Sequence, residues 1–198
     1  MYDIEAVRRD FIGRTSPRRR AKYPVEHEPI RRHCMMVGND NPLYIEPGYL
    51  AAPERGPSFA KASAPRTPCP PTAIWIFSMV ERLGPKGPKP ARSSREKPDE
   101  KLSDSPFSLS MPMIGSQFTN MGRELEFLLP VYVGDHLSSA TRTADIYLKP
   151  TRLDPESLWI VNEDIITNQK DEVVCLIRNT LMNFRTADEL KAAGVTQK

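Results

Sequence analysis

Cysteine and histidine are scarce in this sequence, and their scarcity limits the chemistry that it can carry. The 198 residues include three cysteines and three histidines, with no Cys-x-x-Cys pair and no cluster of histidines near a cysteine. Zinc sites and disulfide frameworks are built from such groupings. We therefore expect no metal site, and we interpret Cys34, Cys69 and Cys175 as reduced and mostly structural.

Long apolar runs and a strong excess of charge are also lacking. A helix that crosses a bilayer needs about 20 mostly apolar residues, and no stretch approaches that length. The first residues carry acids early and show no apolar core of an export signal. The net charge is only +3, and the basic residues gather at 14–22 and 86–101 rather than in one stripe interleaved with aromatics. These features predict a cytoplasmic protein with no membrane and no nucleic acid among its partners.

Proline, in contrast, is abundant. Ten of the 20 prolines lie between Pro53 and Pro98, which concentrates irregular backbone in that part of the chain. The length suits one domain with a substantial core. We predict a single domain over 1–198, with an N-terminal helical segment 1–22, a flexible insertion at about 84–105 and a short C-terminal tail 186–198.

The most apolar stretch, residues 70–83, predicts a buried central helix. Its two prolines stand where a first helical turn accepts them, and Gly84-Pro85 follows where a helix must stop. Apolar side chains occupy every side of this helix, so the rest of the protein has to enclose it.

The remaining pattern predicts an α+β domain. Asp3 caps a first helix, a second helix spans 28–37 and ends at Gly38, and the basic segment 14–22 between them is interpreted as a solvated loop, with attraction of a phosphate-bearing ligand as the alternative. From Met113 the period changes to two. Strands joined by short connections are expected at 124–129, 139–148, 158–167 and 172–184. Such strands form an antiparallel meander that packs one face on the helix.

Three stretches resemble MaoC-like dehydratases, in the variant that occurs as an N-terminal or noncatalytic half. They are Tyr23 to Ala51 with Gly-Asn-Asp-Asn-Pro-Leu-Tyr, Met121 to Leu137 with Gly-Arg-Glu-Leu-Glu-Phe-Leu-Leu-Pro-Val-Tyr-Val-Gly-Asp, and Ile165 to Phe184 with Asn-Gln-Lys-Asp-Glu-Val-Val. The resemblance implies a hot-dog fold, an antiparallel sheet wrapped around one long helix. It also implies (R)-specific hydration of 2-enoyl thioesters, or the reverse dehydration of 3-hydroxyacyl thioesters. The substrate would be carried on CoA or acyl carrier protein, with no other cofactor.

The catalytic pair of that family is missing from this chain. The family loop supplies Asp, a spacer, Asn-Pro, an aliphatic residue and His, and its Asp and His positions fall at Asn39 and Tyr44. An amide cannot act as a base, and a phenol with a pKa of about 10 is a poor substitute for imidazole. Asp40, one residue away, is the remaining candidate carboxylate. The three histidines, His27, His33 and His136, are interpreted as solvated or packing residues.

What the resemblance leaves in place is a scaffold for binding substrate. The predicted substrate-binding residues are the turn Asn41-Pro42, Tyr44, Thr72 at the start of the central helix, where a backbone amide can polarise the thioester, and the apolar Trp75, Phe77 and Met79.

The resulting hypothesis is a noncatalytic, tunnel-shaping subunit of a hetero-oligomeric hydratase or dehydratase, whose MaoC-like hot-dog partner carries the catalytic Asp and His. Two alternatives stay open: an acyl-thioester-binding or regulatory module without turnover, and a homodimeric hydratase that uses Asp40 or Tyr44. Long-chain, branched and steroid-like acyl groups are equally compatible with the sequence.

Overall fold

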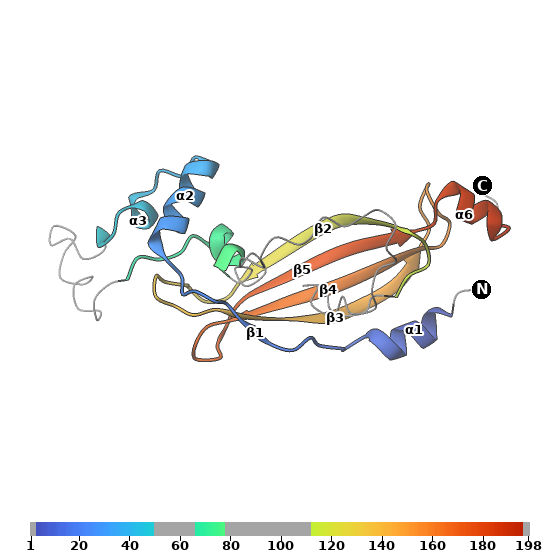
Figure 1. Ribbon diagram of the computed structural model, residues 1–198, viewed down its shortest axis with the longest axis horizontal. Helices are drawn as coiled ribbons and strands as arrows, with labels where there is room; N and C mark the ends of the chain where they lie inside the picture. Colours follow the sequence, from blue (N-terminus) through green and yellow to red (C-terminus); the bar gives the residue numbers. More distant parts are fainter. Residues whose placement is uncertain (1–2, 50–65, 78–111, 196–198) are drawn as a thin grey trace, which may run out of the picture.

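The computed structural model of the chain describes residues 3–49, 66–77 and 112–195, and within them the chain forms a five-stranded antiparallel sheet (Figure 1). The strands follow the spatial order β1-β3-β4-β5-β2. Their bounds are β1 Arg19–Arg20, β2 Gln117–Phe127, β3 Ser138–Lys149, β4 Ser157–Thr167 and β5 Val173–Phe184.

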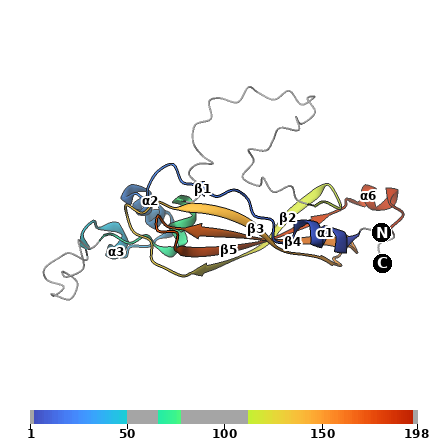
Figure 2. The same ribbon diagram turned by 90° about the horizontal axis from the view of Figure 1, so that it is seen from below.

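Short helices lie at the two ends of this sheet. They are α1 Ile4–Phe11, α2 His27–Val37, α3 Pro42–Ile45, the 3-10 turn η3 Pro71–Ala73 and α6 Ala187–Ala192. Helices α2, α3 and η3 gather at one end, and α1 and α6 lie at the other (Figures 1 and 2). Within the described parts of the chain, no helix is long and apolar enough to span a membrane.

The local signals that end and begin helices are confirmed. The side chain of Asp3 accepts a hydrogen bond from the Ala6 amide at the start of α1. Gly38, in the left-handed conformation with φ 66°, ends α2, as glycine at this position commonly does. Helix α6 in the predicted tail begins with a capping box between Thr186 and Glu189.

Two separate apolar clusters stabilise the sheet. The larger cluster joins α2 and the start of the central helix to the ends of β4 and β5, and it contains Val25, Ile30, Cys34, Cys69, Ala73, Ile74, Phe77, Val131, Leu137, Ile166, Val174, Cys175 and Ile177. The smaller cluster consists of Ile146, Leu158 and Ile160, against which α1 packs through Ile4, Val7 and Phe11. The helical end around α2 and the α1 end therefore have cores of their own.

The central helix is confirmed at its start. One 3-10 turn, Pro71–Ala73, leads into α-helix at 74–77, and the remainder of the predicted helix lies outside the described residues. Ala73, Ile74 and Phe77 are buried, as expected. Trp75 is not, because 37% of it is exposed, so the prediction that the whole circumference is enclosed within the chain is wrong at this position.

The predicted order of strands is partly wrong. Strands β3, β4 and β5 form the expected meander, but β2 pairs with β5 and not with its neighbour in sequence, β3. The difference lies in the path of the connection 128–137, which contributes Val131 and Leu137 to the larger core cluster. This connection leads from β2 at one edge of the sheet to β3, which lies beside β1 at the opposite edge. Strand β2 also starts at Gln117, earlier than predicted.

The basic segment 14–22 is not simply a solvated loop. Arg19 and Arg20 form the edge strand β1, which pairs with Ser139 and Ser138 of β3. In the N-terminal segment 1–22, helix is confined to α1 among the residues described. The predicted insertion at about 84–105 falls outside those residues.

Candidate functional site

The loop between α2 and α3 is held by its two asparagines. The side-chain oxygen of Asn39 accepts a hydrogen bond from the Asn41 amide at 3.1 Å. The side-chain oxygen of Asn41 in turn accepts from the Leu43 amide at 3.0 Å, which caps α3 with Pro42 in its first turn. Asn39 therefore shapes the turn at the position where a catalytic carboxylate was sought, and Asp40 beside it is exposed.

Tyr44 contributes its ring to packing. It lies in α3, half-buried against the larger core cluster. Its backbone N–H donates to the Asn41 carbonyl at 3.1 Å, so the ring is carried by a rigid turn. No carboxylate–imidazole pair results at Asn39 and Tyr44.

A contact that the sequence analysis missed joins α2 to the central helix. His33 is only 8% exposed, and its Nε2 lies 3.0 Å from the hydroxyl oxygen of Thr72, within hydrogen-bond distance. The interpretation of His33 as a packing residue is confirmed, but its partner was not foreseen. The available signal was helical spacing, since His33 shares the buried face of α2 with Ile30 and Cys34.

The first turn of the central helix presents one backbone donor among the residues described. Pro70 and Pro71 have no N–H, and the amides of Ala73 and Ile74 donate to the carbonyls of Pro70 and Pro71. The N–H of Thr72 is thus the group that remains for a thioester carbonyl at this turn.

The apolar residues predicted to line a tunnel are placed in different surroundings. Phe77 is 3% exposed within the larger cluster, whereas Trp75 is 37% exposed. Met79 lies outside the described residues. The structure therefore brings Tyr44 and Phe77 into one cluster and leaves Trp75 at the surface.

The buried thiols near this turn are not nucleophiles. Burial raises the pKa of Cys69 to about 12, with a smaller contribution from Cys34 and Asp135, and burial raises the pKa of Cys175 to about 11. All three cysteines are free and buried, as expected of structural residues. The thiolate required for nucleophilic attack is therefore strongly disfavoured.

The arrangement around the start of the central helix offers hydrogen-bond donors but, among the described residues, no carboxylate–imidazole pair. Thr72 supplies a hydroxyl and an N–H, and His33 behind it has no carboxylate partner among the residues described. No cluster of metal-ligating side chains occurs in those residues either.

Comparisons with known proteins identify solved structures with a similar fold. No protein-family model matches the sequence, and no curated protein does. Solved structures do match: the ChsH1-ChsH2 complex from Mycobacterium tuberculosis at TM-score 0.58 and 21% identity, over 88% of this chain and 90% of that one. The truncated HadBC (3R)-hydroxyacyl-ACP dehydratase complex from the same organism matches at TM-score 0.52 and 17% identity, over 88% of this chain and 98% of that one. A MaoC-like dehydratase matches at TM-score 0.52 and 16% identity, over 89% of this chain and 43% of that one.

Likeness of backbone at such low identity establishes the fold, and it agrees with the antiparallel sheet packed on the start of a buried helix. The chain therefore has the α+β hot-dog fold of MaoC-like proteins.

Proposed function

We propose that the chain is the noncatalytic, substrate-shaping subunit of a hetero-oligomeric hydro-lyase, an (R)-specific 2-enoyl-thioester hydratase or 3-hydroxyacyl-thioester dehydratase. The proposal rests on the roles of Asn39 and Tyr44, which stand at the two positions where the reaction needs a carboxylate and an imidazole. The Asn39 side chain instead shapes a turn, and the Tyr44 ring packs on the larger core cluster.

The missing groups define what the partner must supply. Adding water across a 2-enoyl thioester requires a base that takes a proton from water near Cβ and an acid that delivers a proton to Cα. An amide side chain can do neither. A second hot-dog subunit that carries Asp and His would provide both, and two of the matched structures are two-component complexes by name.

This chain would contribute binding and orientation. The N–H of Thr72 is the donor available to polarise the thioester carbonyl, which stabilises the enolate that forms during the reaction. Trp75, which is 37% exposed, would contact the acyl group, and Met79, the other residue predicted for this role, lies outside the described residues. The substrate would be held on CoA or acyl carrier protein without any further cofactor.

Strand β2 is the surface we assign to the partner. Every residue of this edge strand is exposed. Leu125 and Phe127 pair with Ile177 and Cys175, two members of the larger core cluster, so they continue the core face of the sheet to its open edge. An edge with apolar side chains and free backbone groups is a template for another strand.

The test is hydration of a medium-chain trans-2-enoyl-CoA, followed by loss of the conjugated thioester absorbance. We expect turnover only when the chain is mixed with a co-purifying hot-dog subunit that carries an Asp-x-Asn-Pro-x-His loop. Asp40→Asn is expected to leave the turnover of the mixture within about threefold, because Asp40 is exposed and the base lies in the partner.

Turnover by the chain alone, abolished by Asp40→Asn, would instead establish the homodimeric alternative. Acyl-thioester binding without turnover, even with that partner, would favour the binding or regulatory module, which the same missing groups support.

A further inference from the structure

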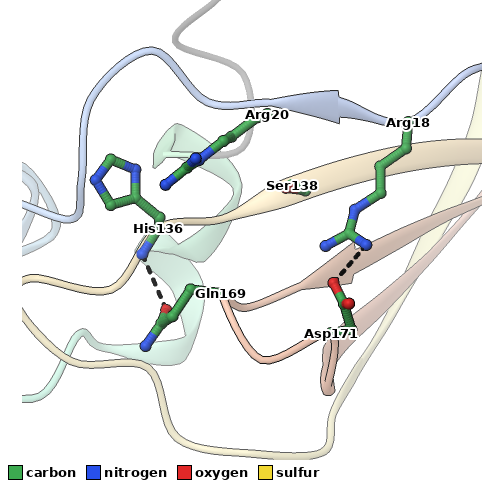
Figure 3. A pocket seen from close by; sticks show the side chains of 6 residues that line it. All are labelled: Arg18, Arg20, His136, Ser138, Gln169 and Asp171. Atoms are coloured by element: carbon green, nitrogen blue, oxygen red, sulfur yellow. Dashed lines mark hydrogen bonds and ion pairs between the residues drawn. The ribbon is translucent and has the colours of Figure 1, made fainter.

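An open hollow of about 360 Å³ lies beside β1, and none of its lining residues comes from the turn that contains Thr72. Figure 3 shows its six lining residues, which are Arg18, Arg20, His136, Ser138, Gln169 and Asp171. They come from β1 and the residue before it, from the first residue of β3 and the segment before it, and from the turn between β4 and β5. None of them belongs to the site proposed above.

The sheet places two arginines on one side of this hollow. Arg20 pairs with Ser138 across the β1–β3 ladder. Arg18, which directly precedes the two-residue strand β1, lines the same hollow as Arg20. In Figure 3 the Arg20 side chain extends toward the His136 ring, and Arg18 extends toward Asp171.

The opposite wall is fixed by Gln169. Its side-chain oxygen accepts a hydrogen bond from the His136 amide at 3.1 Å. Its side-chain nitrogen donates to Asp135 at 3.0 Å, and Asp135 is itself only 3% exposed. This turn is therefore held in place without any ligand.

Some polar groups of the hollow have no partner of their own among the described residues and are available to bind an anion. In the part of the chain that the structure describes, no carboxylate pairs with Arg20, and the buried Nδ1 of His136 has no hydrogen-bond partner. Buried polar atoms of this kind are normally paired. Arg18 is paired with Asp171 at 2.6 Å, but both side chains are largely exposed, and exposed ion pairs contribute little. Arg18 can therefore exchange this carboxylate for another anion.

We propose that this hollow binds a phosphomonoester dianion. The planar fork of arginine matches phosphate oxygens in bidentate geometry, and two guanidinium groups balance two negative charges. Arg20 and Arg18 would hold the phosphate oxygens. An N–H at Nδ1 of His136 and the hydroxyl of Ser138 would donate to the same group, and Asp171 would oppose binding by competing for Arg18.

Coenzyme A is the source that fits this chemistry in the context of the proposed function. Its ribose carries a 3′-phosphomonoester, whereas the prosthetic group of an acyl carrier protein is joined through a phosphodiester with a single charge. The choice of CoA thus rests on the proposed function. Binding of a phosphate dianion does not, since it follows from the arginines, the imidazole and the hollow alone.

The test is calorimetric titration of the full chain with CoA, with dephospho-CoA and with inorganic phosphate, at one low ionic strength. We expect CoA to bind at least about tenfold more tightly than dephospho-CoA, and inorganic phosphate to compete with it. Arg20→Gln should remove this difference. Arg20→Lys, which keeps the charge but not the fork, should reduce it.

Two further variants sharpen the result. Asp171→Asn is expected to raise the affinity for phosphate severalfold, because it removes the competing carboxylate while asparagine tolerates the backbone φ of 64° at this position. Arg152→Gln, an exposed arginine in the β3–β4 turn, removes the same charge elsewhere and should change nothing.

Equal affinity for CoA and dephospho-CoA, with phosphate binding that Arg20→Gln abolishes, would support the anion site and identify free phosphate as its ligand. No phosphate binding, or equal losses in Arg20→Gln and Arg152→Gln, would overturn the proposal. Because this titration measures no turnover, a chain that binds CoA but supports no hydration even when mixed with the partner subunit would refute the proposed function and leave this site standing.

Discussion

Asp154 shows how a single buried charge is accommodated in this fold. The residue is 0% exposed, and its carboxylate accepts hydrogen bonds from the Arg185 side chain at 2.7 and 2.9 Å and from the Arg185 amide at 2.9 Å. Burial by itself would raise the pKa of Asp154. The hydrogen bonds from Arg185 and from the Glu156 amide outweigh that effect and hold the pKa below its ordinary value of 3.8.

This lowered pKa predicts how stability depends on acid. A carboxylate whose pKa is depressed in the folded state stabilises the fold above its ordinary pKa, and that contribution is lost as the pH falls through the folded value. Asp154→Asn should lower the free energy of unfolding at pH 7 by about 3 kcal/mol, because it removes the buried carboxylate that pairs with Arg185 and leaves that guanidinium only its contact with the half-exposed Glu156 among the residues described. The difference between the variant and the native chain should begin to shrink as the pH falls below the ordinary pKa of 3.8, and it should vanish only when the pH falls through the lower pKa of the folded state.

Urea unfolding at pH 7 and pH 3 measures both effects. Asp188→Asn is the matched control, since the Asp188 side chain is 96% exposed in α6. A difference between the native chain and Asp154→Asn that is the same at both pH values would contradict the argument.

Single residues also divide into those that sequence reasoning can place and those that it cannot. The cap at Asn41 was predictable, because an Asn-Pro turn depends on neighbours two residues away. The contact of His33 with Thr72 and the pairing of Arg18 with Asp171 join residues far apart in the chain. Nothing in the local sequence of either partner specifies the other.

At the scale of elements, the start of β2 is fixed by one side chain of β5. Asn183 is 0% exposed, and its amide oxygen accepts from the Ile114 and Gly115 amides at 2.6 and 3.0 Å. Its nitrogen donates to the carbonyls of Gly115 and Gln117. Gly115 is in direct contact with the backbone of Phe184, where a Cβ would not fit.

Removing the Asn183 carboxamide should therefore loosen the β2–β5 junction. Asn183→Ala removes four hydrogen bonds to the backbone groups of Ile114, Gly115 and Gln117, and we expect a loss of about 3 kcal/mol in the free energy of unfolding. Asn120→Ala, on the exposed part of β2, should cost far less. Chemical denaturation of both variants measures the difference, and equal losses would show that the junction does not depend on Asn183.

Strands with a buried face were predictable from the sequence. Of β2, only the second half was predicted. Strands β3, β4 and β5 each contain several buried residues, and burial of one face is what produces a hydrophobic period of two in a sequence. Strand β2 is exposed on both faces, so its first half, with Gln117, Thr119 and Asn120, carries no hydrophobic period at all. Sequence patterning reports burial, and it misses a strand segment that is exposed on both faces.

At the scale of the whole molecule, the open edge at β2 predicts association. Leu125 and Phe127 are 39% and 42% exposed on the face that continues the core. Replacing both by lysine should prevent pairing with the partner subunit and shift sedimentation toward a monomer, because charges on an edge strand oppose the addition of another strand.

The fold should survive this change, since the side chains are exposed. Leu153→Lys, half exposed in the β3–β4 turn, is the control and should leave association intact. A double-lysine variant that still assembles with the partner as the native chain does would place the interface elsewhere.

The order of the strands in the sheet could not be predicted from the local sequence pattern. Pairing β2 with β5 rather than β3 depends on where the connection 128–137 runs. That path is set by contacts such as the hydrogen bond from the Cys69 amide to the Val131 carbonyl at 2.7 Å. Such contacts become visible only when the chain is folded.

The two apolar clusters have a consequence for the motions of the protein. Helix α2 depends on the larger cluster and α1 on the smaller one, while β3, β4 and β5 run the length of the sheet. Opening of one end therefore need not disturb the other, and amide hydrogens in α1 and α2 should exchange with solvent in separate, unlinked events before those of the shared strands. A thioester held at the Thr72 turn would slow exchange in α2 and leave α1 as free to open as before.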